Sequence, residues 1–304
     1  MRINWKETAG YLLIILASCF FGGSASLGKT LMRDGLSTVM LMQIRSVLTT
    51  TVLFPFLLAF GRRHIKVQKE AFPLFVALAV PGLALVNASY YYAVKTLTIA
   101  LAVFIQFTSP ALVFLYGFLS GKEKATPSKA AALVLSIAGT YLMVQLQSRS
   151  MDTVSWMGVL SAFVSTLSFA FYVILSHHLG KKYSAWTILF YGYGIAAVFW
   201  CFVQNPAETF QRLAESDLWS GAVLFTLLST LIPFILFLSG LRRVTPTGAA
   251  ISSTTETLFA SLFAFVLLGE TLSAGQVIGA VFILAAIFLL VYQKEKVPVV
   301  VSAD

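Results

Sequence analysis

The sequence has 304 residues, of which 58% are hydrophobic and only 11% are charged. Soluble domains carry about 25% charged residues, so this composition excludes a soluble enzyme or binding domain and indicates an integral membrane protein. The net charge of +9 would suggest a nucleic-acid partner in a soluble protein. Here nearly all the basic residues fall in short gaps between apolar runs, where membrane topology accounts for them, so no nucleic-acid partner is expected.

Ten apolar segments follow one another along the chain, each near the ~20 residues that a helix needs to cross a bilayer. Glycine and alanine occur within these runs and no regular alternation is present, which favours helices over a β-barrel. The first segment is longer than the apolar core of a signal peptide, so we expect it to be a span. Residues 204–217 form the one sizeable connection, expected to be a loop. The expected helices are residues 9–31, 38–60, 72–93, 99–120, 129–147, 154–175, 184–202, 219–241, 247–268 and 274–292.

The basic residues are distributed unevenly between the two sides of the expected bundle. With the N-terminus on the cytoplasmic side, the segments on that side hold fifteen Lys and Arg residues and the opposite segments hold four. Lys29 and Arg45, within spans, complete the 21. Basic residues concentrate on the cytoplasmic side of membrane proteins, so this bias predicts a multi-pass protein of the cell membrane with both termini in the cytoplasm.

Residues 95–144 align without a gap with residues 242–291 when they are shifted by 147 residues, which places Glu123 on Glu270. The second half starts after five spans, an odd number, so equivalent helices must cross the membrane in opposite directions. We therefore predict two inverted five-helix repeats, residues 1–147 and 148–304. Secondary transporters commonly use such repeats and bind their substrate in a central cavity between them.

A polar stretch, residues 252–257, interrupts the ninth expected helix and contains Glu256 near the middle of the membrane. An ionisable group there costs roughly 2.5 to 3.5 kcal/mol, so it should face the protein interior or a cavity rather than lipid. Three roles are open to Glu256: a proton-coupling carboxyl, the counter-charge of an amine-bearing substrate, or a structural acceptor for nearby hydroxyl groups. Intramembrane carboxylates favour the functional roles.

Further candidate binding residues follow from the repeat and from helical spacing. The shift of 147 residues pairs Ser109 with Glu256, and Gln106 makes the same part of the fourth helix polar. Asn87 and Tyr91 are four residues apart and share one helix face, which favours a cavity lining, although Tyr91 would also suit an interfacial aromatic belt. The expected substrate-binding residues are Glu256, Thr255, Ser109, Gln106, Asn87 and Tyr91.

Arg45, Lys95 and Pro110 are the candidate gating residues. The two cations lie near the outer membrane face, where long side chains ordinarily reach the interface; turned inward, either would suit a substrate carboxylate or an outer gate. Pro110 frees a backbone carbonyl in mid-helix, which serves as a hinge or simply as a kink. Gly275 and Gly279 form a small-residue pair typical of close packing between helices or between subunits, so a homodimer is left open.

Motifs of the second half have counterparts in the first. They are residues 256–257, 267–272 and 275–280, with counterparts at residues 109–112, 122–126 and 136–140. Together with Phe20-Phe21-Gly22-Gly23-Ser24, these motifs make the chain resemble the EamA branch of the drug/metabolite transporter superfamily. Thr257 stands where the family usually has proline after the glutamate. The resemblance implies a ten-helix carrier that works by alternating access, and it favours export over import.

The sequence therefore predicts a secondary transporter of small amphipathic metabolites, most simply amino acids or related compounds. One carboxyl group, several hydroxyl groups and aromatic faces would suit such solutes. The alternatives are a membrane-embedded enzyme, a non-transporting scaffold, or a proton-coupled exporter of cationic drugs or amines. No phosphate-binding loop, nucleophile elbow or metal-ligand spacing occurs in the sequence, so neither a cofactor, a metal nor an enzymatic activity is expected.

Overall fold

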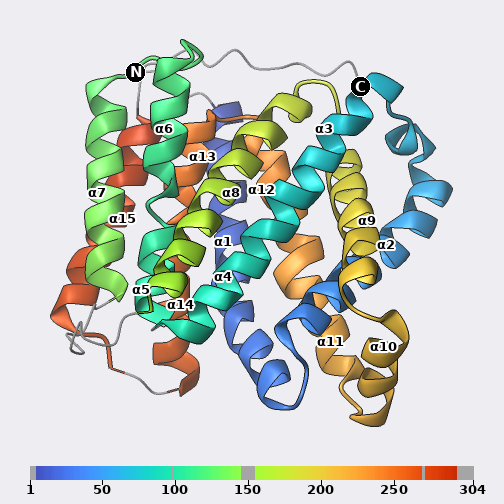
Figure 1. Ribbon diagram of the computed structural model, residues 1–304. Coiled ribbons are helices and arrows are strands. Elements are labelled where there is room, and N and C mark those ends of the chain that lie inside the picture. The colour runs from blue at the N-terminus through green and yellow to red at the C-terminus, as the bar shows by residue number, and fades with distance from the viewer. Residues whose placement is uncertain (1–4, 98, 145–154, 269–270, 293–304) are drawn as a thin grey trace.

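The computed structural model describes residues 5–97, 99–144, 155–268 and 271–292, and the regular structure within them is helical, with no strand. The described chain has ten helical stretches long and apolar enough to cross a membrane, which confirms the all-α membrane fold. They stand side by side as a bundle (Figure 1). The uninterrupted spans are α1 (Trp5–Arg33), α2 (Thr38–Phe60), α7 (Pro127–Val144), α8 (Trp156–Gly180), α9 (Ala185–Val203) and α15 (Ala274–Val291).

The third, fourth, eighth and ninth spans are interrupted. The third and the eighth each contain a π-helical segment, where one wider turn replaces α-helical hydrogen bonding. The fourth and the ninth are each broken into two α-helices. In chain order the pieces are α3 (Phe72–Ala77), η3 (Leu78–Ala84) and α4 (Leu85–Thr96); α5 (Ile99–Gln106) and α6 (Ser109–Leu119); α11 (Trp219–Thr226), η5 (Leu227–Leu231) and α12 (Ile232–Leu241); and α13 (Pro246–Ser253) and α14 (Thr255–Leu268).

The interruptions fall at equivalent places in the two halves. A shift of 147 residues carries Phe107, in the break between α5 and α6, onto Thr254, in the break between α13 and α14. The same shift lays most of η3 over η5. Helix packing follows the same rule, because α4 packs on α8 as α12 packs on α1. Figure 1 shows α1 and α8 running in opposite directions along the bundle. These features are consistent with the expected inverted repeat.

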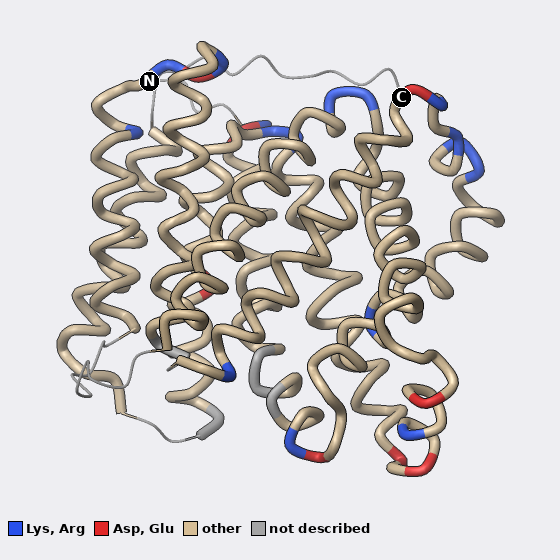
Figure 2. The backbone as a smooth tube through the Cα atoms, viewed as in Figure 1, with Lys and Arg blue, Asp and Glu red and all other residues tan. Residues whose placement is uncertain are grey.

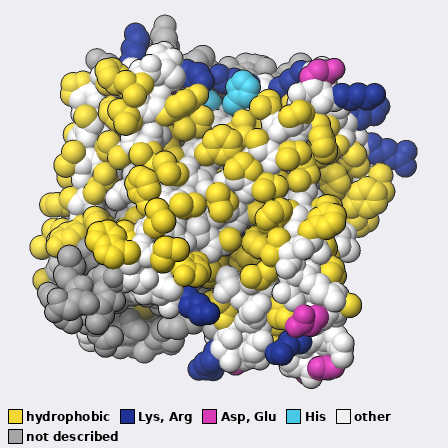
Figure 3. Space-filling view, in the orientation of Figure 1, with side chains coloured by type: hydrophobic (Ala, Val, Ile, Leu, Met, Phe, Trp, Pro, Cys, Tyr) yellow, Lys and Arg dark blue, Asp and Glu magenta, His cyan; other side chains and the backbone are white. Residues whose placement is uncertain are grey.

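Charged and apolar residues are separated along the bundle. Lys, Arg, Asp and Glu residues gather at its two ends (Figure 2), and hydrophobic side chains cover the side between them (Figure 3). Large hydrophobic side chains are exposed in the described chain; for example, Trp156 is 84% and Phe202 is 88% exposed. Apolar exposure on this scale would be a liability in water and is what a surface in contact with lipid requires. We call the end that carries the connections at residues 61–71, 120–126, 181–184 and 242–245 the basic end.

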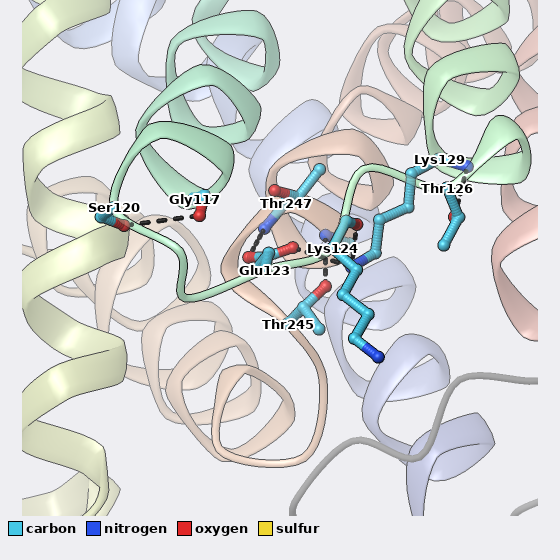
Figure 4. A network of polar contacts seen from close by, with 9 residues as sticks. Gly117, Ser120, Glu123, Lys124, Thr126, Lys129, Thr245 and Thr247 are labelled. Carbon is cyan, nitrogen blue, oxygen red and sulfur yellow. Dashed lines mark hydrogen bonds and ion pairs between the residues drawn. The ribbon is translucent and has the colours of Figure 1, made fainter.

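A buried ion pair at the basic end joins the two halves of the chain. Lys129 Nζ lies 3.1 Å from Glu123 Oε2, and the two side chains are only 2% and 6% exposed. Glu123 Oε1 accepts a hydrogen bond of 3.2 Å from the backbone N–H of Thr247, in the first turn of α13. Glu123 thus connects the loop between α6 and α7 to the ninth span (Figure 4). Glu270, its expected counterpart, lies outside the described residues.

One expectation about the connections was wrong. Residues 204–217 are not a plain loop, because they contain the helix α10 (Pro206–Glu215). Asn205 caps this helix by accepting a hydrogen bond of 3.0 Å from the N–H of Ala207. Thr209 and Leu213 are buried on its inner face. Glu208, Arg212 and Glu215 are exposed on its outer face, so the segment forms an amphipathic helix.

The small-residue pair of the tenth span packs within the chain at Gly279. A Cβ atom at Gly279 would lie 2.6 Å from the carbonyl oxygen of Gly139, so the glycine allows α15 and α7 to approach closely. At Gly275 an added Cβ would meet no atom closer than 3.7 Å. Packing between helices therefore accounts for Gly279, and the homodimer stays a prediction.

Candidate functional site

A cavity of about 160 Å³ lies between the two halves of the bundle. Its wall is made by α1, α2, η3, α4 and α5 from the first half and by α8, α11, η5, α12 and α14 from the second. The π-helical segments and the broken spans thus meet at the cavity. Five of the predicted site residues line it: Arg45, Asn87, Tyr91, Gln106 and Glu256.

Glu256 lies in the first turn of α14, directly after the break at Thr254. The partial positive charge of a helix N-terminus favours a carboxylate in this position. No hydrogen bond or ion pair reaches the carboxylate from the part of the chain that the structure describes. The structural role, in which neighbouring hydroxyl groups satisfy this carboxylate, therefore finds no support among the hydrogen bonds.

The break beside Glu256 forms without a proline at residues 252–258. Instead, the hydroxyl groups of the polar stretch donate to backbone carbonyls three or four residues earlier, and such bonds compete with the helical ladder and bend helices. The donors are Ser253, Thr254, Thr255 and Thr257, with distances of 2.7–2.9 Å. The same hydroxyl groups are therefore turned toward the backbone and away from the glutamate.

α1 approaches the glutamate more closely than a side chain would permit. A Cβ atom at Gly22 would lie 2.8 Å from the carbonyl oxygen of Glu256, so glycine is needed for this helix contact. On either side of Gly22, Phe21 and Ser24 line the cavity. The Phe-Gly-Gly-Ser motif thus brings α1 against the start of α14.

Arg45, on α2, is the cation of the cavity and is 5% exposed. Its guanidinium group lies 5.9 Å from the ring centres of Tyr193 and Phe225. No carboxylate forms an ion pair with it in the described residues. Its side-chain hydrogen bonds with oxygen go to neutral groups. Nε donates to Thr230 Oγ1 at 3.0 Å, Nη1 to Asn87 Oδ1 at 3.2 Å, and Nη2 to Tyr193 OH at 3.1 Å and to the carbonyl of Ser229 at 3.4 Å.

The rest of the cavity lining combines polar and aromatic side chains. Gln106 Oε1 is a buried acceptor without a hydrogen-bond partner among the described residues. Tyr90 and Tyr91 pack edge to face, with ring centres 5.4 Å apart. The ring centre of Phe234 lies 5.2–5.9 Å from the ring centres of Phe21, Tyr172 and Tyr193. A ligand here would meet unpaired polar groups and a rigid apolar surface.

Four predicted site residues do not line this cavity. Thr255 is buried and bonds the carbonyl of Ser252 at 2.7 Å. Ser109 is fully buried beside the buried Pro110, and its Oγ has no hydrogen-bond partner in the described chain. Lys95 is exposed near the end of α4. Their binding and gating roles stay predictions without a place in the cavity.

Sequence reasoning missed the residues that hold Arg45. Tyr193 and Thr230 come from the seventh and eighth spans, far from Arg45 in the chain. The available signal was weak: Thr230 lies in the polar pair Ser229-Thr230 within an apolar span. Which cation such a pair would contact depends on how the helices pack, and no spacing rule within one helix supplies that.

A second cavity, of about 300 Å³, lies between α5, α7, α14 and α15. Thr257, Ser261, Thr271 and Gln276 give it polar groups, but its lining includes no charged side chain. The smaller central cavity is therefore the stronger candidate site, because it alone of the two contains an acid and a base.

Comparisons with known proteins agree on the kind of protein. The sequence profile described as the EamA-like transporter family matches residues 8–145 and 156–292. An uncharacterized transporter of Archaeoglobus fulgidus is 32% identical over 214 residues, covering 68% of this chain and 74% of that protein. A solved crystal structure superposes with a TM-score of 0.72, covering 95% of this chain and 96% of its own, and at 16% identity it speaks for the fold alone.

Two more relatives are named for what they transport. The threonine/homoserine exporter RhtA of Salmonella typhimurium is 25% identical over 280 residues, covering 90% of this chain and 88% of that protein. The S-adenosylmethionine/S-adenosylhomocysteine transporter of Chlamydia muridarum is 25% identical over 317 aligned positions, covering 99% of this chain and 97% of that protein.

Proposed function

This chain belongs to the EamA-like transporter family and is a multi-pass membrane transporter, and we propose that it carries small zwitterions that bear an ammonium and a carboxylate group, with amino acids as the simplest case. One observation carries the proposal. Arg45 and Glu256 line the same cavity, yet no ion pair joins them or occupies either of them in the described chain.

A zwitterion is the ligand that satisfies both groups at once. A buried charge without a counter-charge is costly, and hydrogen bonds to neutral groups compensate it only in part. The substrate carboxylate binds the guanidinium of Arg45, and the substrate ammonium binds Glu256 and the open acceptor Gln106 Oε1. A simple amine would leave Arg45 unpaired, and a simple carboxylate would leave Glu256 unpaired.

The size of the cavity favours a small solute. Its volume of about 160 Å³ is well below the roughly 300–1,000 Å³ of sites for drug-sized ligands. This argues against the alternative of a cationic drug exporter. The relative named as a threonine/homoserine exporter adds support, because both of those solutes are small and carry an ammonium and a carboxylate on one carbon.

The carrier works by alternating access between two inverted halves, residues 1–147 and 148–304, with both termini in the cytoplasm. What supports this part of the proposal is that both halves contribute to the cavity wall and that their interrupted spans correspond under one shift. Broken helices around a site at the interface of two repeats are common in secondary transporters. Rocking of the halves would expose the cavity to each side in turn.

The test uses the purified protein in sealed liposomes loaded with unlabelled threonine, with uptake of labelled threonine as the signal. We expect homoserine to compete, whereas isopropanolamine and 3-hydroxybutyrate, each lacking one of the two charged groups, compete at least 10-fold less well. Glu256→Gln should cut exchange about 10-fold or more, because a hydrogen bond to a charged group contributes roughly 1.5–3 kcal/mol.

The matched control is Glu215→Gln, which removes an exposed carboxylate from α10 and should leave exchange unchanged. If isopropanolamine competes as well as homoserine, the site recognises only the ammonium group and the zwitterion proposal fails. Full exchange by Glu256→Gln would contradict the role of the carboxylate.

A further inference from the structure

A second polar site lies at the basic end, separate from the central cavity. It is a pocket of about 440 Å³ between the loop that follows α2, the connection from α8 to α9, and the residue that follows α12. We call it the basic pocket. Its charged lining residues are Arg63, Lys66, Lys182 and Arg242, and its lining contains no Asp or Glu. Lys and Arg side chains are seen at this end in Figure 3.

The neutral groups of the basic pocket also suit an anion. α9 begins here, with Ser184 as its N-cap and Thr187 in its first turn, and both residues line the pocket. The partial positive charge of a helix N-terminus adds to that of the cations. Burial, and then the guanidinium groups of Arg63 and Arg242, lower the pKa of His64, which lies in the same wall.

The loop that carries Arg63 and Lys66 is fixed to α9 and to the residues before it by hydrogen bonds. Tyr191 OH donates to the carbonyl of Ile65 at 2.7 Å, and the Ser184 hydroxyl lies 2.8 Å from His64 Nδ1. The N–H of Gln68 donates to Tyr183 OH at 3.4 Å, and the side chain of Gln68 accepts from Lys182. These hydrogen bonds hold the cations in an ordered frame. An excess of positive charge on one side of a membrane does not by itself require such order.

An apolar surface continues from the basic pocket along the side of the bundle. Phe56 and Phe60, at the end of α2, are 44% and 82% exposed. Phe56 packs against Phe60 and against Trp186 on α9, with ring centres 5.5 and 5.4 Å apart. A cationic pocket directly beside exposed aromatic rings matches the two parts of a phospholipid, a phosphate headgroup and its acyl chains.

We propose that the basic pocket binds the phosphate headgroup of an anionic phospholipid, whose acyl chains lie on Phe56, Phe60 and Trp186. Basic pockets between spans on one side of a membrane protein recognise anionic headgroups in this way. The proposal does not depend on which solute the central cavity binds, because none of the residues involved lines that cavity.

The experiment measures lipid binding to the full chain purified in detergent, by native mass spectrometry with phosphatidylglycerol and with phosphatidylcholine. We expect phosphatidylglycerol to bind at least 10-fold more tightly. Arg63→Gln with Lys182→Gln should weaken that binding roughly 25-fold, about five-fold for each charge removed. Lys66→Gln, at an exposed side chain, should weaken phosphatidylglycerol binding about five-fold without disturbing the loop.

The matched control is Lys122→Gln with Lys124→Gln, which removes two exposed charges from the same end outside the pocket. Equal weakening by the control would mean general attraction to the basic end and would overturn the proposal. Inorganic phosphate is the second arm. If phosphate binds with a micromolar dissociation constant and phosphatidylglycerol shows no preference over phosphatidylcholine, the site serves free phosphate and the lipid assignment fails.

Discussion

Two cations are buried among the residues that the structure describes, and they have different surroundings. Lys129, at the basic end, is 2% exposed and lies 3.1 Å from the carboxylate of Glu123. Arg45, in the central cavity, is 5% exposed and donates to Thr230, Tyr193 and Asn87, which are all neutral. The first cation has its counter-charge within the chain, and the second has none in the described residues.

Under the proposed function, this difference separates a structural charge from one available to a ligand. Glu123 and Lys129 satisfy each other, and Glu123 also accepts a hydrogen bond from the second half, so this pair connects the two halves in the conformation seen here. Arg45 donates hydrogen bonds to groups from both halves, but no anion in the described residues neutralises its positive charge. In the proposed carrier, the paired charges would hold the two halves together and the unpaired cation would bind the substrate.

The largest effect should come from breaking the paired cation. Lys129→Met leaves the Glu123 carboxylate buried and unpaired, and removal of one partner of a buried ion pair costs about 3–5 kcal/mol. We expect a marked drop in the unfolding temperature of the protein in detergent. The double variant Glu123→Gln with Lys129→Met should recover most of the loss, because no uncompensated charge remains. Equal losses in the single and the double variant would contradict a structural ion pair.

Replacing the unpaired cation should have the opposite profile. Arg45→Gln leaves no carboxylate without its counter-charge, so the unfolding temperature should stay within a few degrees. Threonine exchange should fall about 10- to 100-fold, as expected for losing hydrogen bonds to a charged substrate group. Arg45→Lys should fall in between, because it keeps the charge without the planar donor group. Arg33→Gln is the matched control at an exposed arginine whose side chain is 82% accessible. A destabilised Arg45→Gln with normal exchange would make Arg45 a second structural charge.

The ten spans could be predicted from the sequence because a bilayer imposes length and apolarity on each helix. The second span was expected at residues 38–60 and occurs as α2, Thr38–Phe60. Hydropathy does not detect where a span is interrupted, so η3 and η5 were not foreseen. At residues 204–217 it indicated a polar connection and missed α10.

The candidate site was predictable to the extent that polar side chains stand out at mid-depth. Glu256, Gln106 and Asn87 were predicted for that reason, and all three line the cavity. Thr255, the neighbour of Glu256, does not line the cavity, because successive residues on a helix face different directions. Its hydroxyl group instead donates to the carbonyl of Ser252, across the break at Thr254. The contact of Arg45 with the second half depends on packing between distant spans, which one sequence does not reveal.

His64, a third basic side chain, sharpens the comparison because its environment disfavours the charge. Burial, followed by Arg63 and Arg242, lowers its pKa below the ordinary value of 6.5, while Ser184 holds its ring and Lys66 and Lys182 line the same pocket. Below about pH 6.5 the unfolded chain therefore binds more protons than the folded one at this residue, and stability falls as the pH drops toward the folded pKa. His64→Gln removes this contribution, so between pH 7.5 and 5.5 its unfolding temperature should fall slightly less than that of the unaltered protein. His178→Gln, at an exposed histidine, is the control. An identical pH dependence in His64→Gln and the unaltered protein would mean that His64 accepts a proton as readily as it does in the unfolded chain, and that the basic pocket does not oppose a further positive charge.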